Sequence, residues 1–263
     1  MTANRTAAVS AILMATALGL LLVPSGHSLA AGSESRGMTA LESAAASGKY
    51  LFIFFWRNND PQNQALYHTF QSAMEKMSDT ADAVSILIID AREKPVVDKF
   101  GVSRAPMPLV LAIAPNGAIT KGCPSRFDES QLRQALVSPC TADCMKALQD
   151  RKLVLLCVQN QSQVKQVSLQ KGVEDFTTDK EYAHNSKVVV LNAGDPTEGA
   201  LLKSLQVDPN TAAPVTVFMA PPASVIGTFT GAVTKEQLVA KLKSAQSSCC
   251  PGGKCGPGGC GPK

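Results

Sequence analysis

The sequence has few aromatic residues and no marked excess of charge of one sign. Aromatic residues make up 5% of its 263 positions, with one Trp and three Tyr, and charged residues make up 17%. The 25 Lys and Arg are interspersed with the 21 Asp and Glu, so they form no basic stripe. Nucleic-acid-binding proteins present a basic surface, often with base-stacking aromatic side chains. The composition therefore excludes nucleic acid as a partner.

The sequence also lacks the motifs of several common enzyme classes. It has no phosphate-binding glycine-rich loop, no Gly-x-Ser-x-Gly and no His-Glu-x-x-His. Beyond the N-terminal segment, only His68 and His184 remain, and a histidine-based site would need both to meet across two domains. The apolar content of 45% excludes wholesale disorder, collagen and coiled coil, and the length favours two domains.

The N-terminal residues have the pattern of a secretory signal peptide. Arg5 precedes an apolar run from Ala7 to Val23, and the small-residue segment Ser28-Leu29-Ala30 follows. We expect residues 1–30 to be cleaved after Ala30. The alternative is a retained anchor, but the run is short for a membrane span. The sequence thus predicts an exported protein, periplasmic or secreted, with no stable membrane span after cleavage, in a compartment where thiols can be oxidised.

After a polar linker at residues 31–37, the sequence repeats itself. The segment PLVLAIAPNGAI from Pro108 aligns without a gap with PVTVFMAPPASV from Pro214, and the same offset of 106 residues relates Leu132 to Leu238. A repeat of this kind fixes domain boundaries. We expect one domain at residues 38–139, a second at 140–246 and a separate tail at 247–263.

Each copy has the same order of elements. Apolar runs and helical periodicity predict helix, strand, helix, strand, helix, a two-strand hairpin and a last helix. In the first copy the helices are expected at 38–47, 61–77, 95–100 and 128–137, and the strands at 49–56, 84–90 and 108–115, with a further short strand before the last helix. The fold class is therefore α/β, with two mixed central sheets flanked by helices.

This order, together with FFW ahead of a helix and the segment FGVSRAPMPLVLAIAPNG, resembles the thioredoxin fold in both copies. The resemblance implies a cis-proline just before the hairpin. Counting forward from Gly101-Val102 selects Pro106, whereas counting back from the Asn-Gly turn selects Pro108, which we prefer; Pro214 is its counterpart. The alternative for each is a rigid trans turn ahead of a strand.

Redox-active thioredoxins carry Cys-x-x-Cys where the first strand ends and the next helix begins, and the helix N-terminus there stabilises the attacking thiolate. Here that loop contains Trp56, Asn59, Asp60 and Pro61 and no thiol. Asp60 and Pro61 are typical of an N-cap and a first helical position. The second copy, from Val158 onward, has no thiol either. We therefore expect both domains to be redox-inactive at this place.

Four of the eight cysteines lie within the repeats. Cys157 falls in an apolar strand and Cys123 follows the hairpin, so both are expected to be core residues. Cys140 and Cys144 fit either a local disulfide pinning the interdomain linker or a pair of free thiols at a helix start, and export favours the disulfide.

The C-terminal tail, SSCCPGGKCGPGGCGPK, has no apolar side chain with which to build a core. Its thiols, Cys249, Cys250, Cys255 and Cys260, can converge on a soft ion such as Cu(I) or Zn(II). Disulfide formation is the competing outcome in an oxidising compartment.

Two functions remain open on these observations. The leading one is an exported, non-catalytic binding or scaffold protein that takes a protein or extended peptide ligand at the Asp60 loop and the Pro106–Pro108 loop, with the tail as its reactive part. The alternative is a thiol-disulfide oxidoreductase or metal-handling protein that uses the tail cysteines or Cys140 with Cys144.

Overall fold

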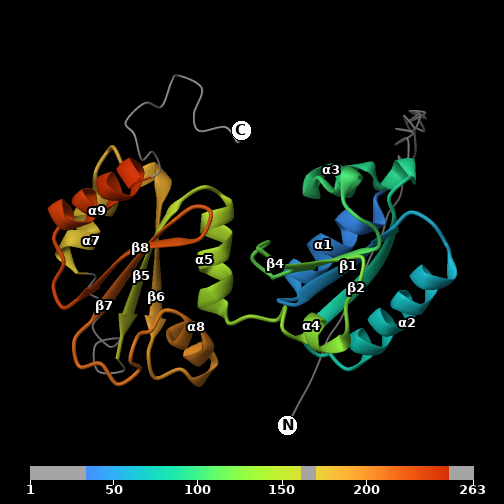
Figure 1. Cartoon of the computed structure of the whole chain (residues 1–263), viewed down its shortest axis with the longest axis horizontal. Coiled ribbons are helices and arrows are strands. Elements are labelled where there is room, and N and C mark those ends of the chain that lie inside the picture. The colour runs from blue at the N-terminus through green and yellow to red at the C-terminus, as the bar shows by residue number, and fades with distance from the viewer. Residues whose placement is uncertain (1–33, 161–169, 249–263) are drawn as a thin grey trace, which may run out of the picture. The chain divides into compact units, whose positions relative to one another are not determined.

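A computed structural model describes residues 34–160 and 170–248 of the chain. It contains two four-stranded sheets with the strand orders β2-β1-β3-β4 and β6-β5-β7-β8. In each sheet one pair of strands is parallel and the two others are antiparallel. We call each sheet with its helices a domain (Figure 1). Both domains have the mixed thioredoxin-like topology that the repeated pattern predicts.

The first domain is built from four strands and four α-helices. The strands are β1 (Tyr50–Trp56), β2 (Ala81–Leu87), β3 (Leu109–Ile113) and β4 (Ile119–Pro124), and the helices are α1 (Arg36–Ala46), α2 (Pro61–Glu75), α3 (Lys94–Phe100) and α4 (Glu129–Arg133), with 3-10 turns η1 (Ala91–Glu93) and η2 (Val102–Arg104).

The second domain repeats this order in its described part. The strands are β5 (Leu153–Gln159), β6 (Ser186–Asn192), β7 (Val215–Ala220) and β8 (Ser224–Thr230), and the helices are α5 (Pro139–Gln149), α7 (Lys171–Thr178), α8 (Gly199–Ser204) and α9 (Lys235–Ser248), with 3-10 turns η3 (Ala183–Asn185) and η4 (Pro196–Glu198).

Each sheet has a hydrophobic core on both of its faces. In the first domain, Phe52 and Phe54 of β1 pack with α2 and α4, while Leu51, Ile53 and Phe55 pack with α1 and α3. Alternate residues of a strand point to opposite faces, so a central strand covered on both sides is apolar throughout. This explains why β1 shows no alternation of apolar and polar residues.

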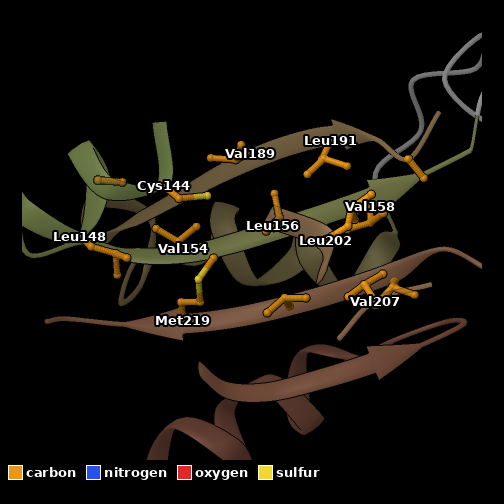
Figure 2. Close-up of a cluster of buried hydrophobic side chains, with 14 residues drawn as sticks. Cys144, Leu148, Val154, Leu156, Val158, Val189, Leu191, Leu202, Val207 and Met219 are labelled. Atoms are coloured by element: carbon orange, nitrogen blue, oxygen red, sulfur yellow. The ribbon is translucent and has the colours of Figure 1, made fainter. Parts of the chain in front are cut away.

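The second domain divides its core in the same way. One cluster joins α5 and α8 to the sheet through residues such as Leu148, Val154 and Leu202, and Figure 2 shows Cys144 among them. The other joins α7 and α9 through Phe176 and Leu238. Both residues of the predicted pair Leu132 and Leu238 are fully buried.

Several sequence-based boundaries were wrong, among them that of the helix expected at 128–137, which is the shorter α4, Glu129–Arg133. The strand expected at 84–90 is β2, Ala81–Leu87. Its last bond to β1 runs from the Ile88 backbone N to the Trp56 carbonyl, and Ile89 is 69% exposed, so the apolar run outlasts its partner strand. Cys140 and Cys144, considered above as residues of the interdomain linker or of a helix start, both lie within α5, which begins at Pro139 behind the N-cap Ser138.

Candidate functional site at the opening of helix α2

Helix α2 begins with an acidic cap where redox-active thioredoxins carry a thiolate. Asp60 is the N-cap and Pro61 is the first helical residue. The Asn63 backbone N donates to Asp60 Oδ1 at 2.8 Å, and Asn63 Nδ2 donates to Asp60 Oδ2 at 3.2 Å. Both carboxylate oxygens are thus engaged by the first turn of the helix. A carboxylate here satisfies the free N–H groups and the positive end of the helix dipole.

The loop ahead of α2 is hydrogen-bonded to the η2 turn, which leads into the Pro106–Pro108 loop, and β1 and β3 pair at Phe55 and Leu109 next to both loops. Arg57 Nη2 donates to the Ser103 carbonyl at 3.0 Å. The Met107–Pro108 peptide bond is cis. Pro108 is buried, whereas Pro106 is exposed. The structure therefore brings the Asp60 loop and the Pro106–Pro108 loop together at one end of the sheet, as the resemblance implies.

A cavity of about 380 Å³ lies beside the opening of α2. We call it the α2 cavity. It is lined by the carboxamides Asn58, Asn59, Asn63 and Gln64, by the aromatic residues Phe54, Trp56 and Tyr67, and by His68 and Ser85. No carboxylate, lysine or arginine lines it, so it suits an uncharged group that forms hydrogen bonds and has one apolar face.

The second domain differs from the first at the proline that precedes its hairpin. The Ala213–Pro214 bond is not cis; the cis bond of this domain joins Pro221 and Pro222 in the β7–β8 turn. Pro214 therefore precedes its strand as the predicted counterpart of Pro108 but without a cis bond. The strand β5 ends at the buried residue Gln159, and the helix opening that would follow Asn160 lies outside the described residues.

The cysteines of the described part are free thiols. Cys123 and Cys157 are buried in the cores, as predicted. Of the two alternatives for Cys140 and Cys144, the structure has the pair of thiols, on successive turns of α5, and not the linker disulfide.

None of these thiols is activated. Burial, with the nearby Glu198 carboxylate, raises the pKa of Cys140 to about 12. Burial, with the Asp143 carboxylate, likewise raises the pKa of Cys144 to about 12. Burial raises the pKa of Cys157 to about 11 and also raises that of Cys123. A nucleophilic cysteine needs a lowered pKa, and none of these four has one.

Two buried glutamates were missed from the sequence. Glu93 accepts hydrogen bonds from Ser35 Oγ at 2.7 Å, from the Gly37 N at 3.0 Å and from the Arg36 N at 3.1 Å. In the second domain, Glu198 accepts from Ser138 Oγ at 2.5 Å and from the Cys140 N at 3.1 Å. The repeated pattern Asp-x-x-Glu at the η1 and η4 turns is the signal that could have found them.

The residues that the structure describes contain no group of three or more His, Cys, Asp or Glu that could hold a metal ion. The predicted metal ligands Cys249, Cys250, Cys255 and Cys260 lie outside those residues, as does the predicted signal peptide. Within the described ranges no helix is long and apolar enough to span a membrane.

Comparisons with known proteins give structural likeness only. No family profile matches the chain, and no curated protein matches its sequence. The zinc-bound form of human ERp44 is 9% identical with a TM-score of 0.35, covering 83% of this chain and 60% of that one. The first two thioredoxin domains of Eps1p from Naumovozyma dairenensis are 11% identical with a TM-score of 0.30, and the match covers 83% of this chain and 98% of that one. The thioredoxin Deadhead from Drosophila melanogaster is 17% identical with a TM-score of 0.31, and the match covers 39% of this chain and 93% of that one. The thioredoxin-like description of both halves rests on their strand order and connections.

Proposed function

We propose that this protein is an exported, non-catalytic binding module that uses a thioredoxin-like scaffold to hold a polypeptide ligand. One observation carries the proposal: Asp60, not a thiol, occupies the N-terminus of α2, and Asn63 binds both of its carboxylate oxygens. Thiol-disulfide exchange requires a thiolate that attacks and a second thiol that resolves the mixed disulfide. This helix opening supplies neither.

The ligand class follows from what the site offers. The Asp60 loop is joined by the Arg57–Ser103 hydrogen bond to the η2 turn that precedes the Pro106–Pro108 loop, and the Asp60 loop and Pro106 are exposed. Next to them, the α2 cavity offers carboxamide donors and acceptors beside aromatic rings. Backbone amides and neutral polar side chains form hydrogen bonds with such groups without the cost of burying a charge. A protein or an extended peptide therefore suits this end of the sheet.

The alternative, an oxidoreductase that works through Cys140 and Cys144, is disfavoured by both thiol pKa values of about 12. At neutral pH such thiols are almost entirely protonated and do not attack a disulfide. The tail thiols are then the only candidates left for redox or metal chemistry. We propose that they are the chemically reactive part of the protein.

An exchange assay tests the non-catalytic role. The exported protein and a variant without residues 249–263 are each mixed with a disulfide-containing model protein and a reductant. Background rates are expected for the truncated variant, and turnover at an enzyme's rate by that variant would refute the proposal.

A metal titration tests the tail separately. Cu(I) and Zn(II) are titrated into the same two proteins after complete reduction. Binding by the longer protein alone is expected if the tail captures metal, because its thiols are the soft ligands that these ions prefer. Equal stoichiometry in both proteins would rule out metal capture by the tail.

A further inference from the structure

Strand β2 forms one edge of the first sheet, and its partner in the described part of the chain is β1. The Tyr50 N donates to the Thr80 carbonyl and the Ile88 N donates to the Trp56 carbonyl, both at 3.0 Å. Backbone groups of alternate residues in a strand point to opposite sides. The backbone N–H and C=O groups that point toward β1 are therefore those of residues 80, 82, 84, 86 and 88. The N–H and C=O groups of Ala83 and Ser85 point to the open side, and so does the N–H of Leu87.

The open edge of β2 has a hollow on each side. On the α2 side, the α2 cavity reaches Ser85 and Tyr67, and a second hollow of about 220 Å³ continues from these two residues past Ala83 toward Met74. On the α1 side, a hollow of about 520 Å³ lies against Val84. Successive side chains of an added strand would point alternately into these two sides.

β2 also lacks the features that protect an edge strand from pairing. Edge strands are usually blocked by charges, prolines or bulges. β2 has no proline, its register with β1 is continuous, and its single charge, Asp82, is paired with Lys49 at 3.4 Å. The opposite edge, β4, contains Lys121 and Pro124 and has a register shift against β3. Of the two edges, β2 is the one open to a further strand.

We propose that the open edge of β2 binds an extended segment of a partner polypeptide as an added strand. This inference builds on the proposed binding role and places the ligand's main chain on β2. Backbone hydrogen bonds to Ala83, Ser85 and Leu87 provide affinity, and the hollows on either side select the side chains.

The chemistry of the hollows defines the partner. Asn58, Asn59, Asn63 and Gln64 are the polar carboxamides of the α2 cavity, and Trp56 and Tyr67 flank them. Carboxamides pair well with Asn, Gln, Ser and Thr side chains. The partner segment thus carries an uncharged polar residue where it faces the α2 cavity. The second hollow on this side, past Ala83, is lined by Phe70, Met74 and Glu75 and so also accommodates an apolar or basic side chain. On the other side, the hollow near Val84 includes both Glu34 and Arg36 and tolerates either charge.

The test uses the exported protein and an array of capped seven-residue peptides with Asn, Gln, Ser or Thr at alternate positions. The best peptide is then N-methylated at every second residue, once on each of its two edges. Methylation of the pairing edge is expected to weaken binding by about tenfold or more, and methylation of the other edge to leave it unchanged. Peptide binding should slow hydrogen exchange of the Ala83, Ser85 and Leu87 amides.

Matched variants test the protein side. Ser85→Pro removes an N–H that faces the open edge and no bond to β1, so the sheet is retained and peptide binding is lost. Ser85→Thr keeps the N–H and retains binding. Should Ser85→Pro fail to fold, the N-methylated peptides still decide the question.

Several results would overturn the inference. It fails if no peptide binds at millimolar concentration, or if binding survives methylation of both edges. Loss of binding in Arg57→Ala but not in Ser85→Pro would place the ligand on the Asp60 loop, which refutes the β2 site and leaves the binding role intact. Slow exchange of the three amides without peptide would mean that a second copy or another part of this chain occupies the edge, and would also refute it. Enzymatic exchange in the truncated protein would refute the non-catalytic role alone.

Discussion

Helix α1 of the first domain and helix α5 of the second begin over the same kind of buried carboxylate, but the two carboxylates bind different numbers of backbone N–H groups. Glu93 binds one hydroxyl and two backbone N–H groups, whereas Glu198 binds one hydroxyl, one backbone N–H and the weakly donating Cys140 thiol. The position of Arg36 is taken in α5 by Pro139, which has no N–H to donate. Both copies of the repeat therefore keep a buried glutamate that binds the start of a helix, but the proline in the second copy removes one of its hydrogen bonds.

The buried polar side chains of the second domain are also less completely hydrogen-bonded than those of the first. Val110 of β3 pairs with Phe54 of β1, and Thr216 of β7 pairs with Cys157 of β5 at the same register. Thr216 is fully buried, and its hydroxyl faces the Cys157 sulfur, which is a weak hydrogen-bond acceptor. Among the described residues, Gln159 and Ser186 each also have a buried side-chain oxygen without a hydrogen-bond partner. All three belong to the second domain. The first domain has the better satisfied interior, and it is also the one with the candidate binding site.

The largest expected effect concerns thiol reactivity at pH 8. With pKa values of about 12 for Cys140 and Cys144, their thiolate fraction lies about 10³-fold below that of an ordinary exposed thiol. We expect iodoacetamide to modify the reduced tail cysteines about 10³-fold faster than these two, as followed by mass spectrometry. A thiol titrates toward the reactive anion as pH rises, so the rates for Cys140 and Cys144 should rise about tenfold per pH unit between pH 8 and 11. Rapid modification of either at pH 8 in the folded protein would contradict the buried placement.

The next largest effect is expected when a pair of thiols is introduced at the opening of α2. The double variant Asp60→Cys with Asn63→Cys puts a Cys-x-x-Cys on the first turn, where the helix dipole stabilises a thiolate. We expect disulfide exchange about 100-fold above the parent, because the attacking thiol would lie at the helix N-cap and the resolving thiol one turn further on. The single variant Asp60→Cys is the control, since it lacks the resolving thiol and should stop at a mixed disulfide. Parent-like rates in the double variant would mean that this helix opening cannot support the chemistry.

A third prediction compares how much stability each of the two buried glutamates contributes to its domain. Glu93→Ala leaves three donors without an acceptor and is expected to cost about 3 kcal/mol of stability, while Glu198→Ala leaves two, besides the weakly donating Cys140 thiol, and costs about 2 kcal/mol. Hydrogen exchange resolved by domain measures both losses. The matched variants Glu93→Gln and Glu198→Gln keep one acceptor oxygen and should lose less. A larger loss for Glu198→Ala would reverse the ranking of the two helix starts.

The strands and the repeat could be predicted from sequence because they depend on local patterns. The continuous apolar runs predicted the central strands, and the spacing of Pro108 and Pro214 predicted how the two copies align. The strand pairing confirms this alignment, because Phe55 pairs with Leu109 in the first sheet and Val158 pairs with Val215 in the second. The roles of Glu93 and Glu198 depend on contacts with residues about sixty positions away, and the repeated Asp-x-x-Glu pattern that marks both glutamates does not identify those partners. The acidic cap at Asp60 was predictable because an N-cap is a local feature.

The smallest effect exchanges the residues that distinguish the two cores. Thr216→Val removes a buried hydroxyl whose neighbour is the weakly accepting Cys157 sulfur, and it gives β7 the residue found at the same place in β3. We expect the second domain to gain about 1 kcal/mol, because a buried hydroxyl with only a weak acceptor is costly and valine fills nearly the same volume. The reciprocal change Val110→Thr should cost the first domain about 1 to 2 kcal/mol, since it buries a hydroxyl beside Phe54 with no partner there. Denaturant unfolding followed by domain-resolved hydrogen exchange measures both changes. A loss of stability in Thr216→Val would show that the hydroxyl has a stabilising partner, and the inferred difference in polar satisfaction between the domains would then be smaller than the structure indicates.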